Sequence, residues 1–214
     1  PLRRQRQMCI RDRYGGPGLG IMEEVIVNEE LAWGDPGFAT AAYATSLACA
    51  PVITGATHDQ KDKYLRKVAE EGALASYAVT EPGAGSDVAA CKTSAVKDGD
   101  EYVINGSKMW ITGAGYADWF FVLAKTDLDA GYNGMSGFIV ESNTPGLTLG
   151  KKENNMGQRC SDTRSISFDD MRIPAENLVG GSESGGWMNA MKAFDMSRPN
   201  IAAHATGLAE NECP

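Results

Sequence analysis

The 214-residue sequence predicts an α+β fold in which a β domain lies between two helical segments. Helical apolar spacing runs through residues 14–72, short strands separated by turns fill residues 73–182, and helical spacing returns over residues 183–214. Because no helical run interrupts the middle segment, we expect its strands to form a compact antiparallel barrel or sandwich.

Residues 1–13 follow neither period and hold five arginines against one aspartate. An arginine-rich start can be a mitochondrial presequence, but this one lacks serine and an initiator methionine. We expect the segment to be disordered and unrelated to the rest of the chain, so that its deletion leaves the melting temperature unchanged.

Three helices are expected in residues 14–72. An alanine-rich, nearly uncharged run over residues 37–49 predicts a helix buried on several sides. Thr57 and Gln60 form a capping box that opens a later helix, which Gly72 ends, and His58 then lies on its surface. The earliest helix ends near Gly34, and its inward positions are predicted at Ile21, Val25, Asn28, Leu31 and Ala32.

Turn residues divide the middle segment. Residues 97–100 and 105–106 predict hairpin turns, and strands are expected over residues 101–104, 119–124, 137–140 and 164–168. After residue 185 a helix begins, which Pro199 bends or restarts.

The composition excludes several classes of function. A net charge of −8 argues against a nucleic-acid partner. The five cysteines are scattered without a C-x-x-C pair and indicate reduced thiols, and with only two histidines a zinc site or a histidine-based triad is not expected. We expect no membrane span and no signal peptide.

Two motifs combine backbone N–H groups, hydroxyls and one large ring. Residues 77–87 run from a short strand into a glycine loop, and residues 108–112 end a second strand at Thr112. This set suits a planar heterocycle that carries phosphates. The loop is not a G-x-G-x-x-G fingerprint, and taken alone it is more often a plain turn, just as a lone tryptophan such as Trp110 is more often part of a core.

Four runs of residues together resemble the acyl-CoA dehydrogenases, over about residues 14–209. They are 77–88 (YAVTEPGAGSDV), 105–112 (NGSKMWIT), 155–164 (NMGQRCSDTR) and 194–199 (FDMSRP), and the last two are most similar to the medium-chain branch. The resemblance implies an N-terminal helical domain, a middle β-barrel and a C-terminal four-helix bundle of which only the start is present. Residues 210–214 depart from the family pattern, which we interpret as a truncation.

The resemblance also implies the cofactor FAD and the residues that bind it. The threonine that matches Thr80 serves the N1 end of the flavin ring, the one that matches Thr112 approaches N5, and Trp110 matches the tryptophan that lies against the ring. The remaining matches are ring contacts and a loop near the pyrophosphate, namely Tyr77, Val79, Ile111, Gly85 and Ser86.

For the acyl-CoA substrate, the resemblance implies contacts from Ser86, Asp195 and Arg198. Without it, Asp195 and Arg198 would be read as an exposed i,i+3 ion pair. In the same way, Arg159, Asp162 and Arg164 are interpreted as a structural charge network rather than a ligand site.

No catalytic residue is assigned. The carboxylate base of the medium-chain branch is expected beyond Pro214, and the alternative position in some relatives is occupied by Ser197, which cannot serve as a base. The 214 residues alone are therefore expected to be inactive.

The sequence is compatible with three interpretations: an acyl-CoA dehydrogenase fragment for β-oxidation, an acyl-CoA oxidase or nitroalkane oxidase on the same scaffold, and an inactive truncated scaffold. Resemblance further implies a homotetramer that passes electrons to an electron-transfer flavoprotein. It is compatible with either the bacterial cytoplasm or the mitochondrial matrix.

Overall fold

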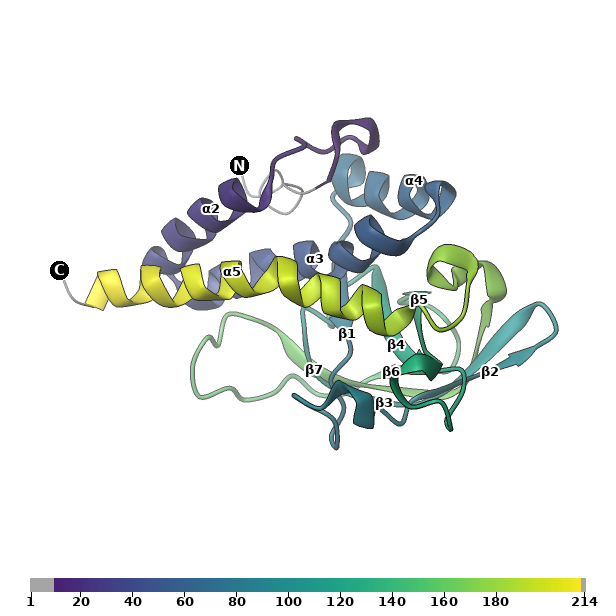
Figure 1. Cartoon of the computed structure of the whole chain (residues 1–214). Coiled ribbons are helices and arrows are strands. Elements are labelled where there is room, and N and C mark those ends of the chain that lie inside the picture. The colour runs from purple at the N-terminus through teal and green to yellow at the C-terminus, as the bar shows by residue number, and fades with distance from the viewer. Residues whose placement is uncertain (1–9, 213–214) are drawn as a thin grey trace.

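The structure, a computed structural model, describes residues 10–212. Its helices gather on one side of a curled β-sheet, and the long helix α5 (Gly186–Glu212) runs beside them (Figure 1). The α+β class predicted from the sequence is confirmed, with helices before and after a strand-rich middle segment.

The N-terminal helices are α2 (Ile21–Gly34), α3 (Pro36–Gly55) and α4 (His58–Arg66). Thr57 and Gln60 form the predicted capping box at the start of α4, and the left-handed Gly72 follows a single π-turn. His58 is exposed, as predicted. The short turns of helix are η1 (Asp12–Tyr14), η2 (Lys67–Glu71), η3 (Val88–Ala90), η4 (Gly131–Gly134), η5 (Ala175–Asn177) and η6 (Val179–Gly181).

The buried face of α2 confirms the predicted stripe at Asn28 and Ala32 but not at Ile21. Its buried residues are Glu24, Asn28 and Ala32, whereas Ile21 is 37% exposed. The reason is that α2 packs along α5, where Asn28 donates a hydrogen bond to Asn200 at 2.6 Å. Asn200 also donates to Glu24, so this polar contact between helices buries a glutamate that apolar spacing alone could not reveal.

By length and composition, helix α3 is long and apolar enough to cross a membrane. No such segment was predicted from the sequence. In the fold 61% of its apolar window is buried. It packs against α2, α5 and β1, so its apolar surface is explained by a core position between the other helices and the sheet.

The seven strands are β1 (Ala75–Ala78), β2 (Ser94–Asp98), β3 (Glu101–Thr112), β4 (Trp119–Lys125), β5 (Met135–Glu141), β6 (Leu147–Leu149) and β7 (Thr163–Pro174). They follow the order β1-β4-β2-β3-β7-β6, with β5 paired to β4. The sheet is not wholly antiparallel as predicted, because β1 and β4 run parallel. The β2–β3 hairpin lies in the connection between them, which is long enough to return the chain in the same direction.

Strand β4 divides the core in two. Trp119, Phe121 and Leu123 face the helices, whereas Phe120, Val122 and Ala124 face the inside of the curled sheet. All six are at most 1% exposed. Because side chains alternate along a strand, a strand covered on both faces is apolar throughout, which is why this segment shows no polar alternation.

The expectation of a hairpin turn at residues 105–106 is wrong. Strand β3 continues through Gly106, and a register shift against β7 marks a bulge there. Gly106 has φ +144°, and a Cβ at this position would lie 2.7 Å from Thr93 Oγ1. The glycine thus serves close packing between strands rather than chain reversal. At Pro199, helix α5 continues without a break.

Residues 10–13 are part of the fold, contrary to the expectation for residues 1–13. Ile10 is 1% exposed and lies in the core with Tyr14, and Arg66 Nη2 donates to the carbonyl oxygen of Arg13 at 3.2 Å. A single isoleucine among arginines carries no periodic signal, so the sequence could not reveal this anchor. Residues 1–9 and 213–214 lie outside the described residues, and the expected disorder of residues 1–9 stays a prediction.

Candidate functional site

The end of β1 and the end of β3 lie side by side. Beyond β1 the chain continues through Val79 to Thr80, whose carbonyl oxygen accepts a hydrogen bond from the amide of Met109 at 2.9 Å. This single backbone contact places Thr80 beside Trp110. The two motifs that the sequence singled out therefore meet in space.

Trp110 has an unusual backbone conformation. Its φ is +60°, and the β3–β7 register shifts between Lys108 and Ile111. A bulge of this kind re-aims a side chain, and for an aromatic residue the left-handed conformation costs on the order of 1 kcal/mol. Trp110 is 56% exposed, so this backbone conformation turns a large aromatic residue out of the sheet.

Thr112 is held at the other end of the bulge. Its carbonyl oxygen accepts a hydrogen bond from Ser76 Oγ at 2.7 Å, and the amide of Gly113 donates to Asp162 O at 2.8 Å. Asp162 also accepts from the Gly115 amide at 2.8 Å and pairs with Arg164 at 2.9 Å. Asp162 and Arg164 thus form the predicted structural network, whereas Arg159 lies outside it and donates to Asn155 O at 3.0 Å.

These strand ends and helices α3 and α5 enclose a pocket of about 200 Å³. Seven of the eight residues predicted to bind the cofactor line it: Tyr77, Val79, Thr80, Gly85, Trp110, Ile111 and Thr112. The structure therefore assembles side chains from separate motifs around one cavity. Ser86 is exposed and lies outside the lining.

Four further lining residues were missed by the sequence reading: Ala44, Leu47, Val88 and Phe194. Ala44 and Leu47 come from α3, and Phe194 comes from the third turn of α5, next to Asp195. Only the low charge of residues 37–49 hinted at such a face, and it could not distinguish a ligand wall from an ordinary core.

Tyr77 forms the apolar base of the pocket. Its ring stacks on Phe121 at a centroid distance of 5.4 Å and meets Phe194 edge-on at 5.9 Å. Its hydroxyl is buried and has no hydrogen-bond partner among the described residues. Burial raises the pKa of this phenol, so it stays neutral and can act as a hydrogen-bond donor.

Asp195 and Arg198 form an ion pair on the outer face of α5, with Arg198 Nη1 3.4 Å from Asp195 Oδ1. Their side chains are 74% and 72% exposed, so this contact alone adds little stability. Both lie outside the pocket lining, although α5 brings them near its Phe194 wall. Ser197 is buried and donates to Phe194 O at 3.1 Å.

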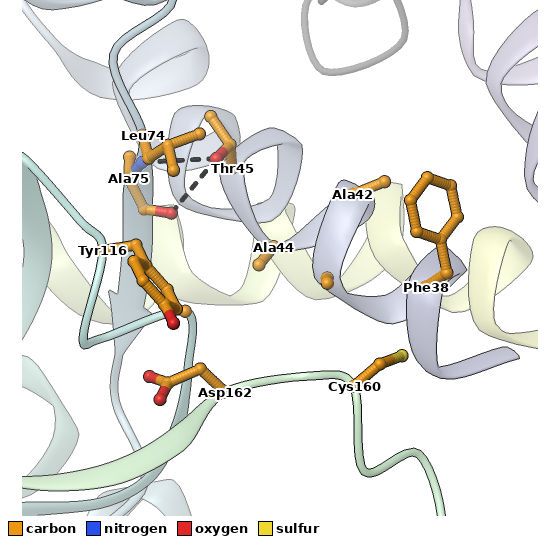
Figure 2. Close-up of a pocket in the computed structure, with 11 residues that line it drawn as sticks. Phe38, Ala42, Ala44, Thr45, Leu74, Ala75, Tyr116, Cys160 and Asp162 are labelled. Atoms are coloured by element: carbon orange, nitrogen blue, oxygen red, sulfur yellow. Dashed lines mark hydrogen bonds between the residues drawn. The ribbon is translucent and has the colours of Figure 1, made fainter. Parts of the chain in front are cut away.

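A second cavity, of about 160 Å³, adjoins the first through Ala44 (Figure 2). It lies between α3 and the turn after β3, and Tyr116 and Asp162 stand on the side opposite Ala44 and Phe38 in that view. Thr45 ties the helix to β1, because its Oγ1 lies 3.3 Å from the amide nitrogen of Ala75. The walls are mainly apolar, so this cavity offers packing space rather than a charged site.

The first pocket fits a flat heterocycle. It combines two half-buried threonine hydroxyls, one exposed indole face and an unpaired buried phenol. Its lining contains no aspartate, glutamate or histidine, so the described residues supply no general base there. No group of three or more potential metal ligands occurs within residues 10–212.

Two family models match the chain. The model of the acyl-CoA dehydrogenase N-terminal domain matches residues 6–72, and that of the acyl-CoA dehydrogenase middle domain matches residues 76–171. The first match begins at residue 6, inside the segment that was expected to be unrelated.

Individual relatives agree. The probable medium-chain specific acyl-CoA dehydrogenase 2, mitochondrial, of Caenorhabditis briggsae is 52% identical over 94% of this chain and 50% of that protein. The structure of butyryl-CoA dehydrogenase from Megasphaera elsdenii has a TM-score of 0.92 at 39% identity, over 97% of this chain and 55% of that one. A solved FAD-dependent dehydrogenase has a TM-score of 0.91 at 29% identity, over 97% of this chain and 57% of that one. The chain spans about half the length of the curated relatives it matches.

Proposed function

Because the chain belongs to the acyl-CoA dehydrogenase family, we propose that it is the flavin-binding part of an FAD-dependent dehydrogenase of medium-chain acyl-CoA thioesters. The observation that carries this proposal is the convergence of seven predicted flavin contacts on one pocket. FAD, when bound, would supply the hydride acceptor for the substrate Cβ, while a carboxylate base takes the proton from Cα.

Each wall of the pocket has its own task in this proposal. The Trp110 face stacks against the flavin ring and excludes water from it. The hydroxyls of Thr80 and Thr112 donate hydrogen bonds to the ring edge, where negative charge accumulates on reduction. The Ser86 loop, outside the lining, lies along the pyrophosphate.

Substrate and partners come from other surfaces. Asp195 and Arg198 contact the CoA portion of the thioester, and their exposure on α5 leaves both free to reach a ligand. The pocket lining holds no carboxylate among the described residues, so the proposal takes the catalytic carboxylate from the part of the relatives' length that this chain does not span. The assembled protein is a homotetramer that passes electrons to an electron-transfer flavoprotein.

A titration of the purified chain with FAD tests the binding proposal. We expect saturable quenching of flavin fluorescence and an induced visible circular dichroism (CD) band. Replacing both hydroxyls, in the variant Thr80→Val/Thr112→Val, should weaken affinity by about 2 kcal/mol, since each hydrogen bond contributes about 1 kcal/mol. The matched control is Thr148→Val, on an exposed position of β6. Absence of FAD binding, or equal loss in the control, would contradict the proposal.

The missing base has a direct test. Sequencing the source DNA past the codon for Pro214 should reveal a helical bundle with a glutamate in a short Glu-Gly loop. The extended protein should then lose its flavin absorbance on anaerobic addition of a medium-chain acyl-CoA. An aspartate at that position would favour nitroalkane oxidation, and rapid reoxidation by oxygen with product bound would favour an oxidase.

A further inference from the structure

A fully buried ammonium group, that of Lys108, contacts the backbone of the pocket residue Val79. Lys108 is 0% exposed, and its Nζ donates to Glu81 Oε1 at 2.8 Å and to Leu123 O at 2.6 Å. A third contact reaches Val79 O at 3.2 Å. An ammonium has three N–H donors, so these three contacts saturate Lys108, and they tie it to the segment that follows β1 and to strand β4.

The Glu81 carboxylate is equally enclosed, with a side chain 6% exposed. Its Oε2 accepts from the Lys92 amide at 2.7 Å, and its Oε1 accepts from both the amide and the hydroxyl of Thr93, at 3.0 and 2.5 Å. Burial alone would raise the pKa of Glu81, but the Lys108 charge and hydrogen bonds from Cys91 and Thr93 lower it to about 2. The pair is therefore a charged, fully bonded cluster.

Both partners are adjacent in sequence to the flavin contacts. Glu81 follows Thr80, and Lys108 precedes the strained Trp110 by two residues, at the edge of the bulge. The amide of Met109, which lies between Lys108 and Trp110, donates a hydrogen bond to the carbonyl oxygen of Thr80. Any shift of Glu81 relative to Lys108 would therefore move the Thr80 hydroxyl relative to the indole ring.

Stability is a poor explanation for such a cluster. A buried ion pair often contributes no more to stability than well-packed apolar residues of the same volume, because both charges lose their hydration. What a saturated network does provide is a unique geometry. We propose that Glu81 and Lys108 are positioning residues that fix Trp110 in its left-handed conformation against Thr80. The inference rests on the proposed flavin site for its functional meaning.

The decisive variant removes both charges at once. Glu81→Gln/Lys108→Met leaves no unpaired buried charge, unlike either single change. The signal of Trp110 is isolated by measuring near-ultraviolet CD and acrylamide quenching with and without Trp110→Phe in each background. Arg172→Met is the matched control, since Arg172 bridges Asp98 and Glu101 on the exposed end of the same sheet.

We expect the double variant to melt cooperatively but to lose the Trp110 CD contribution, with Trp110 quenching altered at least twofold and FAD affinity lowered about tenfold. Arg172→Met should change none of these. An unchanged Trp110 signal in the folded double variant overturns the inference.

The test remains decisive if the wild-type chain binds no FAD or if the double variant does not fold. If the wild-type chain binds no FAD, the proposed flavin site fails, whereas the Trp110 signal still decides whether the ion pair positions the ring. If the double variant does not fold, Thr93→Val decides instead, because it removes only the hydroxyl donor to Glu81. A smaller change of the Trp110 signal in the same direction supports positioning, and no change contradicts it.

Discussion

The carbonyl oxygen of Thr80 accepts a hydrogen bond from the amide of Met109 at 2.9 Å, and this contact joins two strand ends that lie almost thirty residues apart. Because Met109 precedes the bulged Trp110, the same bond sets the spacing between a hydroxyl and an aromatic face. The geometry of the candidate site thus depends on the backbone as much as on the side chains that line it.

Trp110→Ala should weaken flavin binding more than Trp110→Phe. Stacking contributes about 1 kcal/mol beyond the buried area, so the alanine variant should lose roughly fivefold or more in affinity, and the phenylalanine variant less. Flavin fluorescence titration measures both. Tyr116→Ala is the control, because Tyr116 is 70% exposed and lines only the neighbouring cavity. Equal losses in all three variants would show that the Trp110 ring has no specific contact.

Acid should destabilise the chain through Glu81. Its folded-state pKa of about 2 lies below the ordinary value of 4.5, so its contribution is complete above pH 4.5 and disappears as the pH falls towards 2. The shift corresponds to on the order of 3 kcal/mol. Urea unfolding between pH 2 and 6 should show this slope in the wild type and a flatter curve in Glu81→Gln/Lys108→Met, which leaves no unpaired buried charge. Parallel curves would assign the acid sensitivity to other carboxylates.

Protonation of His204 should lower the stability of the fold at a higher pH than protonation of Glu81 does. It is 7% exposed, its Nε2 lies 3.1 Å from Asn28 Oδ1, and Glu24 and Tyr43 belong to the same cluster of helices α2, α3 and α5. Burial lowers its pKa below 6.5, so the unfolded chain binds the proton first and stability falls as the pH drops below 6.5. His204→Gln can retain the donor to Asn28. Its melting temperature should therefore change less between pH 7.5 and 5.5 than that of the wild type, and an identical change would contradict the assignment.

The glycine of the β3 bulge should be intolerant of a side chain. In Gly106→Ala the new Cβ would meet Thr93 at 2.7 Å in a backbone conformation of φ +144°, and Thr93 also bonds Glu81. We expect a loss of about 2–4 kcal/mol in the free energy of unfolding. Gly99→Ala is the control, with φ +62° and no atom within 4 Å, and should lose only about 1 kcal/mol. Denaturant melts of the two variants provide the comparison, and equal losses would exclude a packing role for Gly106.

The sequence was informative where one local rule decides the structure. The capping box at Thr57 and the apolar strand at residues 119–124 needed no knowledge of distant residues. It failed where a distant contact decides, as with Gly106 against Thr93, Glu24 against Asn200 and Ile10 in the core. The same limit applies to the site: motifs gave seven pocket residues, whereas Ala44 and Phe194 enter it only because α3 and α5 pack over the sheet.

Asp195 and Arg198 allow stability and ligand binding to be separated. Their ion pair is over 70% exposed on both sides, so Asp195→Asn and Arg198→Met should each change the free energy of unfolding by less than about 0.5 kcal/mol. If the side chains contact CoA, the same variants should weaken acyl-CoA binding to the FAD-loaded, extended protein several-fold, because a charge-assisted hydrogen bond is lost. Calorimetric titration with an acyl-CoA and with the free CoA moiety measures this effect. The control for binding is Arg66→Met, which removes two exposed i,i+4 pairs, with Asp62 and Glu70, and should leave acyl-CoA binding unchanged. If the variants lose stability but keep their affinity for acyl-CoA, Asp195 and Arg198 form a purely structural ion pair.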